Sequence, residues 1–152
     1  MRKKDFRNWI EISKKAVLHN VSRIKYIVGD KVGVWAVVKS NAYGHGLFVI
    51  PNILERADIY GFCVDSLIEG AKLRDMGVKV PILVLGLTLP GSFSLAKEKD
   101  ITITISSPDS LKALAKSKSA PDFHLKFDTG MHRQGFYVSD LGFVIEQLTA
   151  KS

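Results

Sequence analysis

The sequence predicts an α/β fold built on parallel strands, and three observations support this. Five short apolar runs recur along the 152 residues, with their first residues 20 to 27 positions apart. Segments with helix signals lie between them, as parallel strands require, because each crossover needs room for a helix. Apolar residues make up 46% of the chain and charged residues 24%, which excludes disordered, collagen-like and coiled-coil chains.

The five apolar runs are the expected core strands. The first, residues 32–38, is apolar on both faces, as in a strand that helices cover on each side. The other four are residues 59–64, 81–85, 101–105 and 123–127. A short alternating run at 9–12 predicts a further strand, half exposed or paired elsewhere.

Two architectures fit five such units, an open doubly wound sheet and a (β/α)8 barrel. A barrel commonly needs about 250 residues, so as a barrel this chain would stop after roughly five of its eight units. The resulting expectation is a partial TIM-type barrel. Its first and fifth strands would be unpaired apolar edges, which predicts oligomerisation, aggregation or swapped pairing.

Caps and glycines predict two of the helices. Ser13 is an N-cap candidate for a helix that ends at Gly29, and Asp65 for one that ends at Gly77. The expected buried face of the first comprises Val17, Val21, Ile24 and Val28, and that of the second Ile68, Ala71 and Met76.

Three further segments predict helices. Ser107 followed by Pro108 is a start signal, with Leu111, Leu114 and Ala115 on the helix that follows. Residues 47–57 and 141–148 are also helical in pattern, and Pro51 must lie in the first turn of the former or kink it.

The charge and cysteine content limit the possible partners. The formal net charge is +7, and residues 1–39 carry all of the basic excess, spread rather than clustered beside aromatic residues. This predicts solubility rather than a nucleic-acid partner. The longest apolar stretch is about seven residues, whereas a membrane span needs about twenty. With no secretory signal and one cysteine, Cys63, the sequence predicts a cytoplasmic protein without a membrane partner.

Lys39 is the first candidate for chemistry. It follows the first core strand directly, so it lies at the carboxyl edge, where α/β enzymes place their sites. The loop at 40–46 contains Tyr43, Gly44 and Gly46, and these glycines permit close backbone approach or positive φ. A partly desolvated lysine is a competent Schiff-base nucleophile, and the alternative is a lysine that reaches solvent or pairs with an acid.

A second cluster follows the fifth strand. Lys126, Asp128 and Arg133 lie at or just past its carboxyl end, so they can face the same crevice as Lys39. The forked donors of Arg133 suit a carboxylate or a phenolate oxygen. Asp128-Thr-Gly matches the aspartic-protease tripeptide, but those enzymes are all-β. The four histidines show no ligand spacing, which predicts no metal site, and no nucleotide-binding glycine motif is present.

Two motifs together resemble the alanine racemase family. They are Ala36-Val-Val-Lys-Ser-Asn-Ala-Tyr-Gly-His-Gly46 and, about eighty residues later, Lys126-Phe-Asp-Thr-Gly-Met-His-Arg-Gln-Gly135. The resemblance covers the chain from about position 8, and Ser40 stands where the family more often has alanine. It implies a pyridoxal 5'-phosphate enzyme with an N-terminal barrel and a mostly β C-terminal domain, working as a homodimer that shares active sites.

The resemblance also implies roles for single residues. Lys39 would hold the cofactor and exchange protons with the D-side of the substrate α-carbon, and Tyr43 would reach the cofactor phosphate. Arg133 would lie near the cofactor's phenolic oxygen and the substrate carboxylate. Lys126 matches a lysine that is carbamylated in some members, where the added negative charge positions the arginine.

The expected function is therefore interconversion of L- and D-alanine. Residues 1–12 would be a leader and a strand of the β domain, and residues 13–152 an incomplete cofactor-binding barrel. Because the family takes its opposite base, a tyrosine, from the partner's C-terminal domain, this truncated portion is not expected to be fully active alone. Two alternatives stay open: a non-catalytic cofactor-binding or assembly module, and a racemase for another amino acid, such as serine or a basic one.

Overall fold

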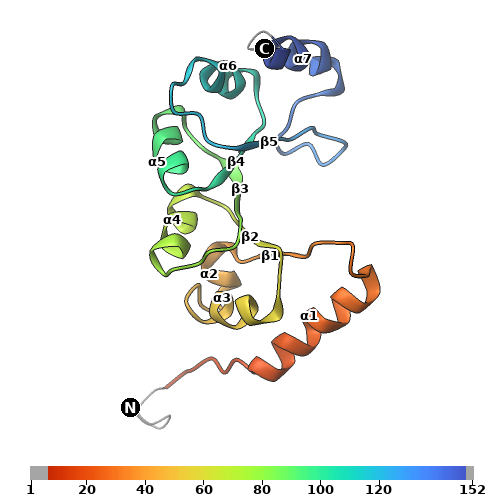
Figure 1. Ribbon diagram of the computed structural model, residues 1–152, viewed down its shortest axis with the longest axis vertical. Coiled ribbons are helices and arrows are strands. Elements are labelled where there is room, and N and C mark those ends of the chain that lie inside the picture. The colour runs from red at the N-terminus through yellow and green to blue at the C-terminus, as the bar shows by residue number, and fades with distance from the viewer. Residues whose placement is uncertain (1–6, 150–152) are drawn as a thin grey trace.

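The computed structural model describes residues 7–149, which form a parallel sheet with helices between the strands (Figure 1). The strands are β1 (Trp35–Val37), β2 (Gly61–Val64), β3 (Ile82–Leu87), β4 (Thr102–Ile105) and β5 (Phe123–Leu125). Their order in the sheet is β1-β2-β3-β4-β5, and every neighbouring pair is parallel. A doubly wound sheet reverses its order at a switch point, whereas a barrel adds each strand beside the last. The order is that of a barrel portion.

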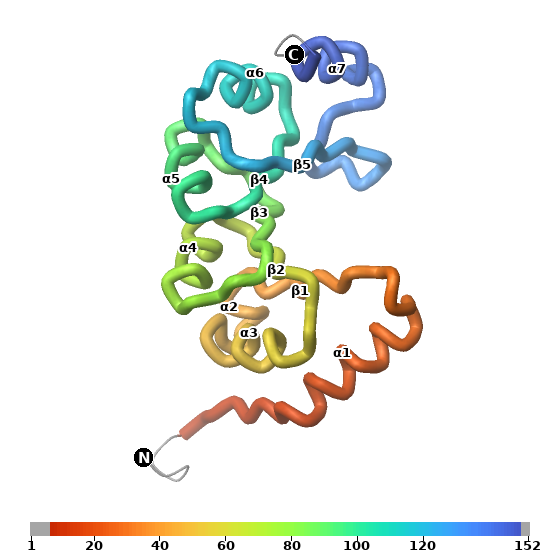
Figure 2. Tube along the Cα trace, viewed as in Figure 1, coloured from red at the N-terminus to blue at the C-terminus, as the bar shows by residue number. Residues whose placement is uncertain are grey.

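The helices lie mainly along one side of the sheet. They are α1 (Lys14–Val28), α2 (Lys39–Tyr43), α3 (Val49–Leu54), α4 (Leu67–Asp75), α5 (Phe93–Glu98), α6 (Pro108–Lys116) and α7 (Leu141–Thr149), with 3-10 turns η2 (Glu55–Ala57), η3 (Pro90–Ser92) and η4 (Val138–Asp140). The tube in Figure 2 follows a crescent, with α3 to α6 on its convex side and the strands towards its concave side. α1 and the segment after β5 extend past the ends of the sheet on the concave side.

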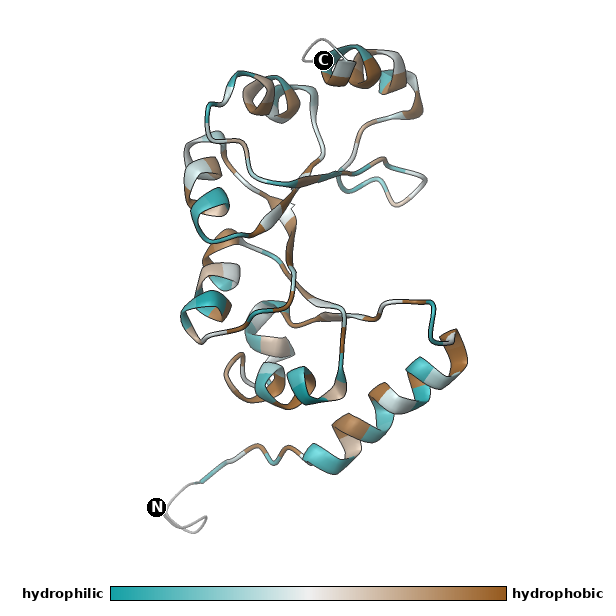
Figure 3. Cartoon of the chain, viewed as in Figure 1, coloured by the Kyte–Doolittle hydropathy of each residue, from teal (hydrophilic) through white to brown (hydrophobic). Residues whose placement is uncertain are grey.

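The core lies between the sheet and the convex-side helices. Figure 3 shows the hydrophobic colour along much of the strands and on parts of the helices. The large side chains with no exposed surface come from β2, α4, β3 and β4: Phe62, Val64, Leu73, Val84, Ile103 and Ile105. Burying each such side chain contributes about 1.5–3 kcal/mol. This packing fixes the strands whose carboxyl ends carry the polar residues.

Residues 9–12, expected to be a strand of the β domain, form no strand within residues 7–149, and their pairing in that domain stays a prediction. The described residues before α1 form no strand, and Trp9 and Ile10 remain 54% and 70% exposed. A strand needs a hydrogen-bonded neighbour, and residues 7–149 place none beside this segment. The Trp9 indole instead donates a local hydrogen bond to Glu11.

The α1 boundaries are confirmed, but most of its expected buried face is not. Ser13 is the N-cap, its hydroxyl accepts from the Ala16 N–H, and the helix ends at Gly29 with φ 81°. On the expected face only Val21 is buried, while Ile24 is 47% exposed. The reason is placement: α1 packs mainly against α3 and η2.

The N-cap of α4 and its buried face also differ from expectation. Ser66, not Asp65, is the N-cap and accepts from the Glu69 N–H. Ile68 is 68% exposed, because the face that meets the sheet is made by Leu67, Gly70 and Leu73. The α6 start is confirmed, with a capping box between Ser107 and Ser110, and Pro51 lies in the first turn of α3.

Candidate active site

The residues after β1 form a left-handed turn that carries Lys39. Ser40, Asn41, Ala42 and Tyr43 have φ values of 52°, 57°, 52° and 53°. This conformation costs roughly 1–2 kcal/mol for each residue other than glycine, so surrounding contacts must hold it. The Asn41 side chain accepts from the Leu47 N–H at 2.7 Å, and the Ala42 N–H donates to the Val38 carbonyl at 2.9 Å.

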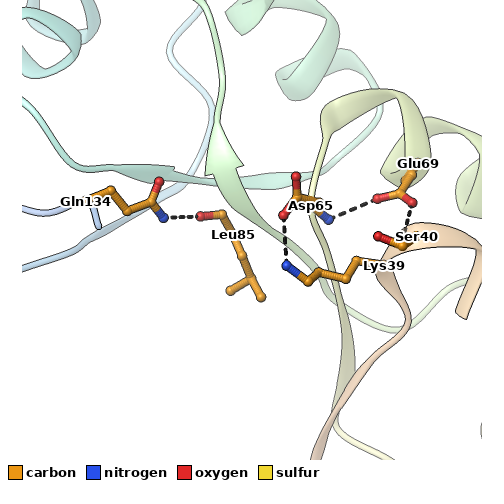
Figure 4. Close-up of polar contacts among 6 residues, drawn as sticks. All are labelled: Lys39, Ser40, Asp65, Glu69, Leu85 and Gln134. Atoms are coloured by element: carbon orange, nitrogen blue, oxygen red, sulfur yellow. Dashed lines mark hydrogen bonds and ion pairs between the residues drawn. The ribbon is translucent and has the colours of Figure 1, made fainter. Parts of the chain in front are cut away.

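Glu69 ties this turn to the end of β2. One of its carboxylate oxygens accepts from the Ser40 N–H at 2.6 Å, and the other accepts from the Asp65 N–H at 3.0 Å (Figure 4). The Asp65 carboxylate in turn accepts from Lys39 Nζ at 3.1 Å. Asp65 was expected as a helix cap, and neither it nor Glu69 was recognised in the sequence as part of the site. The signal available was position alone, since both follow the carboxyl end of a strand next to that of Lys39.

A cavity of about 630 Å³ opens at the carboxyl ends of β3, β4 and β5. Its size lies within the usual range of ligand pockets, about 300–1,000 Å³. The lining residues include Lys39, Lys126 and Arg133, so three cations from distant parts of the sequence meet here as expected. Tyr43 is not among the lining residues and is 61% exposed.

The segment that carries Arg133 is held by its own backbone. The Asp128 N–H donates to the Phe136 carbonyl, and the Phe136 N–H donates to the Lys126 carbonyl, both at 2.8 Å. The Asp128 carboxylate accepts from the N–H groups of Gly130 and His132 at 3.0 Å, and these hydrogen bonds lower its pKa below the ordinary aspartate value. Asp128 therefore organises the loop rather than serving as a protease-like catalytic group.

A bulge in β3 links this segment to the sheet. The strand register shifts between Val84 and Leu87, and the Leu85 carbonyl accepts from the Gln134 amide at 2.8 Å (Figure 4). Within the bulge, the Gly86 N–H donates to the Asp65 carbonyl at 3.0 Å, and a Cβ at Gly86 would clash with that carbonyl oxygen. Bulges commonly redirect groups beside active sites, and here one joins the Lys39 and Arg133 halves of the cavity.

Residues 7–149 contain neither a cluster of metal ligands nor a membrane-spanning helix. Within residues 7–149, no three histidine, cysteine, aspartate or glutamate side chains gather as metal ligands. In the same part of the chain, no helix combines the length and apolarity that crossing a bilayer needs.

Strand order and site together define a class: a (β/α)-barrel portion with a lysine at the carboxyl edge of its first strand and a cationic cavity beside it. Comparison with known proteins identifies the family. The family model described as "Alanine racemase, N-terminal domain" matches residues 12–152, and the chain belongs to this family.

Individual relatives agree with this assignment. The chain is 40% identical over 140 residues to the alanine racemase of Fusobacterium nucleatum subsp. nucleatum, covering 92% of this chain and 39% of the relative. It is 45% identical over 125 residues to the serine/alanine racemase of Enterococcus gallinarum, covering 82% of this chain and 18% of the relative. The crystal structure of Bacillus anthracis alanine racemase with bound L-Ala-P superposes with a TM-score of 0.87 at 31% identity, covering 94% of this chain and 38% of that one. The chain thus spans about two-fifths or less of the length of these relatives.

Proposed function

We propose that this chain is the cofactor-binding N-terminal portion of a pyridoxal-phosphate-dependent alanine racemase, in which Lys39 binds the cofactor. The observation that carries the proposal is the position of the Lys39 amine in the carboxyl-edge cavity together with Lys126 and Arg133. Active sites of such barrels form at this edge. An amine with two further cations complements a ligand that has an aldehyde and several anionic oxygens.

The cavity offers donors that suit two groups of pyridoxal phosphate, its aldehyde and its phenolic oxygen. The Lys39 amine suits the aldehyde, and the forked donors of Arg133 suit the phenolic oxygen or a substrate carboxylate. Neither Arg133 nor Lys126 forms an ion pair among residues 7–149, so both cations are available for an anion. Tyr43 is the proposed phosphate ligand. Its exposed hydroxyl lies on the turn that carries Lys39, outside the cavity lining.

The proposed chemistry is removal and return of a proton at the substrate α-carbon. When bound, pyridoxal phosphate supplies an electron sink for the negative charge that this leaves. Lys39 would move the proton on one face, and Arg133 would orient the substrate carboxylate. Lys126, if carbamylated, would hold Arg133 by its added negative charge. A base for the opposite face would come from the partner subunit of a homodimer, working in the cytoplasm.

Covalent labelling tests the proposal. The chain is incubated with pyridoxal phosphate, reduced with borohydride, and digested for mass spectrometry. The expected result is a cofactor label on Lys39 that disappears in Lys39→Ala and persists in Lys97→Ala, an exposed lysine of α5. Labelling spread evenly over exposed lysines, or none at all, would refute cofactor binding at this site.

A second candidate concerns the substrate. The similarity to a serine/alanine racemase favours a test of serine beside alanine. The chain is co-expressed with the remaining C-terminal part of the Fusobacterium relative, and the D-isomers formed from L-alanine, L-serine and a basic amino acid are measured. Turnover of alanine supports the main proposal and excludes a purely non-catalytic module. Preferential turnover of serine would replace the substrate, and labelling without any turnover would favour the binding module.

A further inference from the structure

The cavity has one carboxylate against three cations. Among the lining residues that the structure describes, Asp65 is the only acid, and it faces Lys39, Lys126 and Arg133. It pairs with Lys39, whose amine lies 3.1 Å from the Asp65 carboxylate. The lysine side chain is 28% exposed and the aspartate side chain 57%. The ion pair therefore stands at the open rim of the cavity and involves the amine on which the proposed function depends.

One side chain, that of Glu69, holds the backbone of Asp65 and of the residue next to Lys39. Glu69 accepts from the Asp65 N–H with one oxygen and from the Ser40 N–H, next to Lys39, with the other. The Asp65 carbonyl accepts from the Gly86 N–H, so its backbone is also held from β3. The backbone that carries the two charged side chains is thus held at three points, which limits the movement of the pair relative to an ordinary surface pair on mobile backbone.

We propose that Asp65 is a positioning residue that holds the Lys39 ammonium at the rim of the cavity, and that Glu69 keeps the two residues in register. The inference rests on the proposed function, since it describes how the cofactor lysine is kept until an aldehyde arrives. Two consequences follow. Asp65 offsets the repulsion between Lys39 and the two other cations of the cavity. It also slows capture of an aldehyde, because the amine must leave the ion pair and lose its proton before its lone pair can attack.

Reductive methylation measures how readily the Lys39 amine reacts with an aldehyde, without the cofactor. The amine nitrogen bonds to the carbon of formaldehyde, the formaldehyde oxygen leaves as water, and cyanoborohydride adds hydride to that carbon. Each step of methylation thus replaces one N–H proton with a methyl group. Peptide mapping by mass spectrometry gives the rate at every lysine, and Lys97 and Lys116, both exposed, serve as internal standards.

The expected result is a change confined to Lys39. Asp65→Asn should raise the rate at Lys39 about two- to fivefold relative to the standards, the size expected for a partly exposed ion pair. Asp65→Glu, which keeps the carboxylate, should stay near the wild-type rate. Glu69→Gln loses one of its two backbone contacts and should raise the rate less. The rate increase at Lys39 in the double variant should be smaller than the product of the two single increases, because both substitutions act on the same contact.

A matched control is available in the same chain. Lys25, on α1, pairs with Asp58 at 2.7 Å, and neither residue is among those that line the cavity. Asp58→Asn should accelerate Lys25 and leave Lys39 unchanged. An unchanged Lys39 rate in Asp65→Asn, or an equal acceleration of Lys39 in Asp58→Asn, would overturn the inference.

Labelling with pyridoxal phosphate separates this inference from the proposed function. If the cofactor labels Lys39 but Asp65→Asn leaves the methylation rate of Lys39 unchanged, the inference fails and the proposed function stands. If the methylation rate responds to Asp65 but the cofactor labels nothing, the cofactor role fails and the ion pair alone is supported. When both hold, Asp65→Asn should also accelerate cofactor labelling of Lys39 by a similar factor.

Discussion

Substituting Gly86 by alanine tests the close approach of β3 to the end of β2. A Cβ at Gly86 would overlap the Asp65 carbonyl oxygen, which is a backbone atom and cannot move aside as the end of a flexible side chain could. Forcing extra atoms into such a contact costs about 1–3 kcal/mol. The matched control is Gly91→Ala in η3, where a Cβ would meet nothing within 4 Å and φ is not positive. There the smaller entropy of the unfolded chain should stabilise the protein by up to about 1 kcal/mol.

Urea unfolding followed by circular dichroism measures both variants. Gly86→Ala should lower the free energy of unfolding by about 1–3 kcal/mol, and Gly91→Ala should leave it unchanged or raise it slightly. Because the displaced carbonyl belongs to Asp65, Gly86→Ala should also raise the methylation rate of Lys39. Equal stability of the two variants would refute the claim that this glycine is required by close packing.

Three further predictions concern stability. Leu73→Ala, at a side chain with no exposed surface, should lower the free energy of unfolding in urea by about 2–5 kcal/mol. Ile68→Ala, at a residue that is 68% exposed, should change this free energy by less than about 0.5 kcal/mol. The reverse order would show that Ile68, as expected from the sequence, lies on the buried face of α4. Ser107→Ala removes the α6 cap and should cost about 0.5–2 kcal/mol by the same measurement, with a loss near zero counting against the capping box. Backbone hydrogen bonds lower the pKa of folded Asp128, so its ionised form stabilises the fold above the ordinary aspartate pKa, and this contribution is lost as pH falls through the folded value. Asp128→Asn should therefore flatten the acid limb of stability against pH, and an unchanged acid limb would contradict this assignment.

Local signals in the sequence predicted much of the fold. The spacing of apolar runs gave five parallel strands, and the Ser13 and Ser107 caps and the Gly29 stop lie where they were expected. These features succeed because a cap or a short apolar run depends on a few neighbouring residues. The Lys39, Lys126 and Arg133 grouping followed from one topological rule, that parallel strands end at a common edge.

Features decided by tertiary contacts were not predictable in this way. Glycines at 44 and 46 signalled positive φ, but four non-glycine residues adopt it as well, held partly by Glu69 from another helix. Asp65 and Ser66 are both suitable N-cap residues. The sequence alone did not show that Asp65 forms an ion pair with Lys39 and that Ser66 caps α4. The exposed face of α1 depends on where that helix sits, which its periodicity does not contain.

The strict succession of strands also bears on how the chain acquires its shape. Paired residues such as Trp35 and Gly61, or Ile103 and Phe123, lie only 20 to 26 positions apart in the sequence. Each new strand needs only its immediate predecessor as a template, so little loop-closure entropy is lost at any one step. A nascent chain leaving the ribosome can therefore fold one βα unit at a time, and the turn that carries Lys39 can form before Arg133 has been synthesised.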